Sequence, residues 1–443
     1  MTQTTSAPPA TWSPPAPQPV ATTPTGTPRR VSPGGAIQAW FAGTPGRMRA
    51  ALLLTAAMAV LFGLAAAQGF RESDGALKRA EANTAQLVRI QAIHTNLVSA
   101  NADATNAFLV GGLEPPAQRQ HFVDSMTQAS KLIAEAATAQ PADQQVLGAL
   151  NSTLLTYQGL VEQARANNRQ GLPIGSQYLK DASASLQNDS LPLLNQLVEA
   201  NESRVGTEFN GIGNGNLWLI VGGLVTLLVL GFALYWLAQR THRYLNLPIA
   251  AAAVLVLLTM LVGGTALSGA SKDAKDTRGH AYADTLALSR ARIAAFDAKS
   301  NESLTLIARG SGDAFDKAWG KSAAEVDKQL AIVEATAPQL GAPWAQYKTN
   351  HAAIRDRDAK KGDWDGAVAL SIGTAAGENA ATTFATFDKS SAASLDTAGK
   401  RVGNELSKAR NGLPPIGWLG LPIGIVAALL AAWGMSQRLG EYR

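Results

Sequence analysis

The chain has 443 residues, a net charge of +5 and a mean hydropathy of +0.01, so apolar and polar segments balance. The cations form no stripe with interleaved aromatic residues, which argues against a nucleic-acid-binding protein. The absence of cysteine excludes disulfides and cysteine-ligated zinc, and the five histidines form no H-x-x-x-H or HExxH pattern, so we expect no metal or other cofactor.

Residues 1–49 are predicted to be a disordered cytoplasmic tail. They are rich in Pro, Thr, Ala and Gly, which bury too little apolar surface to offset the entropy cost of folding. The layout is not that of a signal peptide, so the first apolar run is expected to remain as an anchor. Trp40 and Phe41 precede Arg47 and Arg49, a pattern typical of a segment on the membrane surface; docking of a cytosolic partner is the alternative.

Four apolar runs are long enough to cross a bilayer as helices. We expect transmembrane helices over residues 50–70, 217–239, 247–267 and 416–436. They contain no ionisable residue, which argues against transport by this chain alone. Their glycines are expected to allow close helix packing, and the candidates for this role are Gly222, Gly223, Gly263 and Gly264.

Basic residues occupy every short flank that would be cytoplasmic, whereas the two long outer stretches mix acids and bases. They lie before the first run, in the central turn at residues 240–246, which contains Arg240 and Arg243, and in the tail at residues 437–443. The positive-inside rule therefore predicts a multi-pass plasma-membrane protein with both termini in the cytoplasm. Residues 71–216 and 268–415 then lie outside the cell.

Each outer stretch is predicted to fold as a four-helix bundle. Apolar residues recur at steps of three and four, and the helices are interrupted at GGLEPP, Pro141 and NNRQG in the first stretch and at RGSGD, Pro338 and KKGDW in the second. The last helix of the second stretch is expected to run from Val368 past Val402. The predicted fold is all-α, with four transmembrane helices and two tandem extracytoplasmic four-helix bundles.

The two halves follow one plan, which indicates an internal duplication. NAFLVGG in the first half pairs with LTLIARG in the second, and Tyr157 pairs with Tyr347. We therefore expect a covalent pseudo-dimer whose bundles and spans pack side by side. Glycine and proline interrupt the returning junctions, NGIGNGN and NGLPPIG, whereas the outgoing junctions lack proline and are expected to remain helical.

The turns farthest from the membrane are candidate recognition loops, although solvated turns without a function are the alternative. The partner-binding candidates there are Gly111, Gly112, Glu114, Arg169, Tyr178, Arg309, Arg355, Arg357, Lys360, Lys361 and Trp364. The candidates for contact with a cytosolic partner or the membrane surface are Trp40, Phe41, Arg47, Arg49, Arg240 and Arg243. No nucleophile elbow, Walker A loop or dinucleotide-binding motif is present, so we expect no enzymatic activity.

Each half resembles the sensing module of bacterial chemoreceptors and histidine kinases. The segments TPGRMRAALLL, RIQAIHTNLVSANADATNAFLVGGLEPP and QGLPIGSQYL resemble the actinobacterial GlnX-type membrane proteins. This resemblance implies a sensor that works with a GlnH-type amino-acid-binding lipoprotein, for glutamate, aspartate or related ligands such as glutamine, and with the cytosolic Ser/Thr protein kinase G. It carries over no functional residues.

The predicted function is therefore a transmembrane signal transducer for extracytoplasmic amino acids. Only SQRLGEYR follows the last span, so the signal is expected to pass to another protein. The alternative is a structural or scaffolding protein of an envelope or ABC-transport complex that does not respond to ligand. Membrane lipids are further expected partners, and a homodimer is compatible with the plan.

Overall fold

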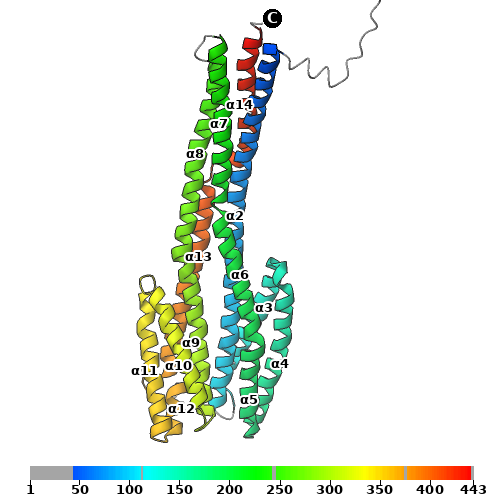
Figure 1. Cartoon of the computed structure of the whole chain (residues 1–443). Coiled ribbons are helices and arrows are strands. Elements are labelled where there is room, and N and C mark those ends of the chain that lie inside the picture. The colour runs from blue at the N-terminus through cyan, green and yellow to red at the C-terminus, as the bar shows by residue number, and fades with distance from the viewer. Residues whose placement is uncertain (1–42, 111–112, 242–245, 374–376, 441–443) are drawn as a thin grey trace, which may run out of the picture.

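The computed structural model describes residues 43–110, 113–241, 246–373 and 377–440. Within these residues the chain is helical and contains no strand, which confirms the all-α fold. Two bundles of helices lie side by side at one end of a long shaft, and both ends of the described chain lie at the other (Figure 1). We call the bundle ends that point away from the shaft the distal ends.

The shaft consists of the four helices that are long and apolar enough to cross a membrane. These helices are α2 (Gly43–Val110), α7 (Asn214–Thr241), α8 (Leu247–Thr277) and α14 (Ile416–Gly440). Large apolar side chains such as Leu228, Phe232 and Leu429 are exposed along them. Because soluble proteins rarely expose so continuous an apolar surface, the chain is a multi-pass membrane protein.

In the shaft, α2 and α14 pack with their backbones in close contact. A Cβ atom at Gly424 would lie 2.8 Å from the carbonyl oxygen of Ala59 and 2.8 Å from the Cα atom of Gly63. Only a glycine permits this approach of two backbones. The predicted packing glycines Gly222, Gly223 and Gly263 also face neighbouring helices, each with a side-chain atom within 2.9 Å of the added Cβ, whereas Gly264 has only an ordinary contact at 3.7 Å.

The junctions between shaft and bundles differ as predicted. α2 passes from shaft to bundle without interruption, and α8 continues through a π-helical turn (Arg278–Tyr282) into α9 (Ala283–Ile307). In contrast, α6 (Leu191–Gly211) ends before α7 begins, and α13 (Ala380–Asn411) ends before α14 begins. The Ser73 hydroxyl on α2 donates a hydrogen bond of 2.9 Å to the carbonyl oxygen of Ile212, which ties the interrupted junction to the continuous helix.

Bundle 1 consists of the distal part of α2 and four further helical segments. These are α3 (Pro116–Ala139), α4 (Gln144–Arg169), α5 (Ile174–Ser185) and α6, with a π-helical turn (Leu186–Ser190) between α5 and α6. Pro116 begins α3, as expected for a residue without an amide hydrogen. The π-helical turn interrupts the regular helix just before Leu191 and Pro192, the first residues of α6. Tyr157 is fully buried in the core, 6.5 Å from Phe122 between ring centroids.

Bundle 2 consists of α9, α10 (Asp313–Ile332), α11 (Gly341–Arg355), α12 (Trp364–Ile372) and α13. The prediction of one continuous last helix was wrong, because α12 and α13 are separate. α12 ends at Gly373, whose φ of +86° favours glycine, and α13 begins after Asn379, whose side chain accepts a hydrogen bond from the Thr382 amide in a capping box. Apolar residues continue at helical spacing on both sides, so the periodicity did not reveal the break.

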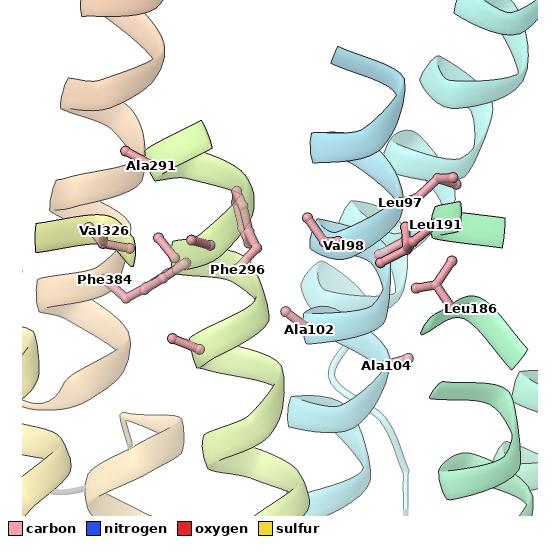
Figure 2. Packing of buried hydrophobic residues seen from close by; sticks show 14 of the residues in the cluster. Leu97, Val98, Ala102, Ala104, Leu186, Leu191, Ala291, Phe296, Val326 and Phe384 are labelled. Carbon is pink, nitrogen blue, oxygen red and sulfur yellow. The ribbon is translucent and has the colours of Figure 1, made fainter. Parts of the chain in front are cut away.

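The bundles pack together through α2 and α9, as the pseudo-dimer prediction requires. Their buried apolar side chains form one continuous cluster, and Val98 and Ala102 of α2 lie on the side that faces α9 (Figure 2). Small buried residues such as Ala298 on α9 allow the two helices to approach closely. The Asn101 amide donates a hydrogen bond of 2.7 Å to the Ser300 hydroxyl across this contact.

Candidate functional site

The distal end of bundle 1 contains a cavity of about 300 Å³ lined by α2, α4, α5, the first turn of α3 and the segment leading into it. Glu114 and Arg169, both predicted partner-binding residues, line it together with Arg119 and Arg165. The Arg165 guanidinium donates a hydrogen bond of 3.0 Å to Glu114 and lies 4.2 Å from the centre of the Phe122 ring. The sequence thus located two residues of this cavity but missed the partly buried Arg165.

The other partner-binding residues predicted at this end are Gly111, Gly112 and Tyr178. Tyr178 is partly buried against the apolar core, so it contributes to packing. Gly111 and Gly112 lie outside the described residues. Nearby on α2, burial raises the pKa of Asp103 to about 7, and repulsion from Asp388 and Glu114 acts in the same direction.

The predicted basic run at the distal end of bundle 2 is neutralised by carboxylates of the same bundle. Arg355 lies 3.0 Å from Asp316 and 2.9 Å from Asp358. The other three cations of the run pair as Arg357–Asp363 at 3.6 Å, Lys360–Asp356 at 3.3 Å and Lys361–Asp356 at 2.7 Å. This pairing weakens the case for a cationic docking surface, because each cation already has an anionic neighbour.

Arg309 and Trp364 form a compact contact at the same end of bundle 2. The Trp364 indole nitrogen donates a hydrogen bond of 2.9 Å to the carbonyl oxygen of Leu306, and the Arg309 guanidinium lies 3.8 Å from the centre of the indole ring. Arg309 adopts a φ of +39°, an uncommon left-handed conformation for a residue other than glycine. Arg309 and Trp364 therefore pack against each other and against α9 at the distal end of bundle 2.

A buried charged network in bundle 2 was missed by the sequence reasoning. Lys299 on α9 lies 2.6 Å from Glu302, which also accepts a hydrogen bond of 2.8 Å from the Ser371 hydroxyl and lies 3.1 Å from the His351 ring. Burial acts to raise the pKa of Glu302, but Lys299 and then His351 outweigh this effect and lower it to about 2. Trp319 stacks on His351 with 3.6 Å between ring centroids.

Each half places a polar group beside the tyrosine that matches its counterpart in the other half, but these polar groups differ. In bundle 1 the Tyr157 hydroxyl and the Ser183 hydroxyl donate to Asn101, at 3.5 Å and 3.0 Å. When NAFLVGG is aligned with LTLIARG, Asn101 occupies the position of Lys299. The polar group at this position is therefore neutral in bundle 1 and charged in bundle 2.

The contact between the bundles also contains a groove with titratable groups. A cavity of about 340 Å³ there is lined by α2, α6, α9 and α10 and includes His94 and Asp297. Burial lowers the pKa of His94 to about 4 and raises that of Asp297 to about 7, although the Gln187 amide, which donates to Asp297 at 3.2 Å, acts to lower the latter. Burial therefore disfavours the charged form of both groups at the contact between the halves.

The predicted residues at the membrane end are only partly described. Arg47 and Arg240 are exposed, and Arg240 lies 6.0 Å from the centre of the Trp236 ring. Arg49 is partly buried. Trp40, Phe41 and Arg243 lie outside the described residues.

The fold defines an all-α, multi-pass membrane protein with two helical bundles at one end. Residues 76–210 match a family model described as an actinobacterial sensor domain. The match runs from α2 through α6, covers less than a third of the chain, and supports a sensor protein. Searches of curated proteins and of solved structures found no match.

Proposed function

We propose that this protein is a non-catalytic transmembrane signal transducer. It senses extracytoplasmic amino acids of the glutamate, aspartate and glutamine class through a solute-binding lipoprotein. It then relays the ligand occupancy of this lipoprotein to a cytosolic Ser/Thr kinase. The observation that supports it best is α2, a single helix of 68 residues. At about 1.5 Å per residue it extends about 100 Å from the basic end of the shaft to the distal end of bundle 1.

The arrangement suits transmission because both bundles lie at the same end of the shaft (Figure 1). Arg47 and Arg240 lie at the opposite end, which the positive-inside rule places in the cytoplasm of a plasma-membrane protein. A lipoprotein bound to the distal turns would contact the ends of helices from either bundle. A small shift between α2 and α9 would then reach the cytoplasmic end along the uninterrupted helices.

The sensor match supports the sensing role, whereas the amino-acid class, the lipoprotein and the kinase come from the GlnX-type resemblance. The alternative is a scaffold for an envelope or ABC-transport complex. The apolar core shared by the two bundles would suit a scaffold equally well, since it holds them in one arrangement.

Disulfide crosslinking separates the two functions, and the natural chain contributes no cysteine of its own. The variant Asn101→Cys/Ser300→Cys reports the contact between α2 and α9, whose side chains are hydrogen-bonded. The control Thr153→Cys/Ser190→Cys joins two hydroxyl-bearing residues, 2.8 Å apart, within bundle 1.

For a sensor, adding the lipoprotein with glutamate, aspartate or glutamine changes the crosslinking rate of the α2–α9 pair relative to lipoprotein alone. The control pair keeps its rate. Identical rates of the α2–α9 pair in both states would refute ligand-dependent transmission and favour the scaffold. Copurification of a Ser/Thr kinase with the full chain, and its loss on deleting residues 1–42, tests the cytosolic partner.

A further inference from the structure

We propose that the cavity at the distal end of bundle 1 is a direct binding site for a small carboxylate with a short apolar portion. This proposal goes beyond the function above, because the ligand would bind this chain itself and not only a partner lipoprotein. It depends on the shape of the cavity, on the charges around it and on a comparison with bundle 2.

The cavity has an apolar floor. Ala104, Ala107 and Phe108 of α2 line one side, and Val161 of α4 and Leu179 of α5 line the other. A volume of about 300 Å³ lies at the lower end of the range typical of small-molecule sites. The floor can therefore receive an apolar group of a few carbon atoms.

The side of the cavity nearest the distal turns carries an excess of positive charge. Arg165, whose side chain is 10% exposed, lies 2.8 Å from Glu162 and 3.0 Å from Glu114, and Arg119 lies 3.6 Å from Glu114 and 3.4 Å from Glu162. Three guanidinium groups, counting Arg169, thus face two carboxylates. Asp103 adds less than a full negative charge at neutral pH, because its pKa is raised to about 7.

Arg169 supplies the group that a ligand would meet first. Its side chain is exposed at the cavity, and it forms no hydrogen bond or ion pair with any residue that the structure describes. A guanidinium binds a carboxylate through two parallel hydrogen bonds, so the uncompensated charge selects this class of ligand. If the ligand also carries an α-ammonium group, Glu114 is the carboxylate placed to bind it.

Bundle 2 shows what occupies the same position when the site is absent. Aligning NAFLVGG with LTLIARG and Tyr157 with Tyr347 places Ala104 and Val161 where bundle 2 has Glu302 and His351. Those two polar side chains interact at 3.1 Å inside bundle 2. Smaller, uncharged residues in bundle 1 leave this space for a ligand.

The test is isothermal titration of the full chain in lipid nanodiscs without any lipoprotein. The probes are butyrate, L-2-aminobutyrate and n-butylamine, which share an apolar chain and differ in charge. We expect saturable binding of one or both carboxylates and none of n-butylamine. Tighter binding of L-2-aminobutyrate than of butyrate, with the difference lost in Glu114→Gln, would identify an α-amino acid site; the reverse order would identify a plain carboxylate site.

Three variants locate the site. Arg169→Ala is expected to weaken binding about tenfold or more, since it removes a charge-assisted contact. Lys360→Ala, which removes one exposed cation from the distal end of bundle 2, is expected to leave binding unchanged. Ala107→Phe fills the cavity and should abolish binding; the charge reversal Arg169→Glu, at an exposed position, gives the same test without altering the core.

Two results would overturn the proposal. One is the absence of saturable binding by either carboxylate, and the other is equal affinity in the natural chain, Arg169→Glu and a folded Ala107→Phe. Because this assay contains no partner, its failure leaves lipoprotein-dependent sensing intact. Conversely, a constant α2–α9 crosslinking rate would refute that function without affecting direct binding.

Discussion

The buried network of bundle 2 allows a quantitative prediction for the variant Glu302→Gln. This change keeps the size of the side chain but removes its negative charge, so the Lys299 ammonium remains in the core without its partner at 2.6 Å. Removing one member of a buried ion pair typically costs about 3–5 kcal/mol. We expect the free energy of unfolding of bundle 2 to fall by this amount.

The pKa of Glu302 provides an independent magnitude. A value of about 2 in the folded protein, against 4.5 for the free side chain, corresponds to about 3 kcal/mol of stabilisation by the ionised form. Because the folded pKa is lowered, this stabilisation is complete above about pH 4.5 and is lost as the pH falls towards 2. The difference in stability between the natural chain and Glu302→Gln should therefore shrink in acid over that window.

Urea unfolding followed by tryptophan fluorescence measures this effect, because one of the indoles, that of Trp319, stacks on His351 beside the network. Glu334→Gln is the matched control, since Glu334 is exposed and a surface change of this kind costs within about 0.5 kcal/mol. The double variant Lys299→Met/Glu302→Gln should recover much of the loss. A cost of less than about 1 kcal/mol for Glu302→Gln, or an equal cost when Lys299 is absent, would refute the reasoning.

Three further changes test other parts of the molecule. Ser73→Pro interrupts the continuous α2 and should abolish ligand-dependent labelling of a cysteine placed at the basic end of α2. Pro414→Ala changes a junction that is already interrupted and should leave this labelling intact, so equal effects of the two variants would contradict transmission along α2. Gly424→Val should lower the melting temperature in detergent, because the valine side chain would collide with the α2 backbone. Gly231→Val is the control, since a Cβ atom at that position meets no atom within 4 Å. Similar melting temperatures of the two variants would argue against close packing of α2 and α14. Asp297→Asn should raise thermal stability at pH 8 but not at pH 4. The Asp297 carboxyl, whose pKa is raised to about 7, stabilises the fold only while it is protonated, so its contribution is lost between about pH 4 and 7. An equal effect of the substitution at the two pH values would disprove this reasoning.

The sequence by itself determined the all-α fold, the four spans and the character of their junctions. Each depends on local chemistry: apolar runs of sufficient length, helical spacing, and proline or glycine at helix ends. The break between α12 and α13 escaped this reasoning, because Gly373 ends the helix inside a segment whose apolar pattern continues. The duplicated plan also indicated that the halves pack together, as α2 and α9 do.

Only the tertiary structure decided which polar residues are buried. Lys299 and Glu302 have the appearance of a surface pair in the sequence, and Arg165 that of one more charge near a turn, yet all three are largely or fully shielded from solvent. Their burial depends on neighbours far along the chain, such as Ser371 and Glu114, that no local pattern specifies. Local spacing predicts a helix and its apolar face, but the cavity, the ion pairs and the groove arise from how several helices meet.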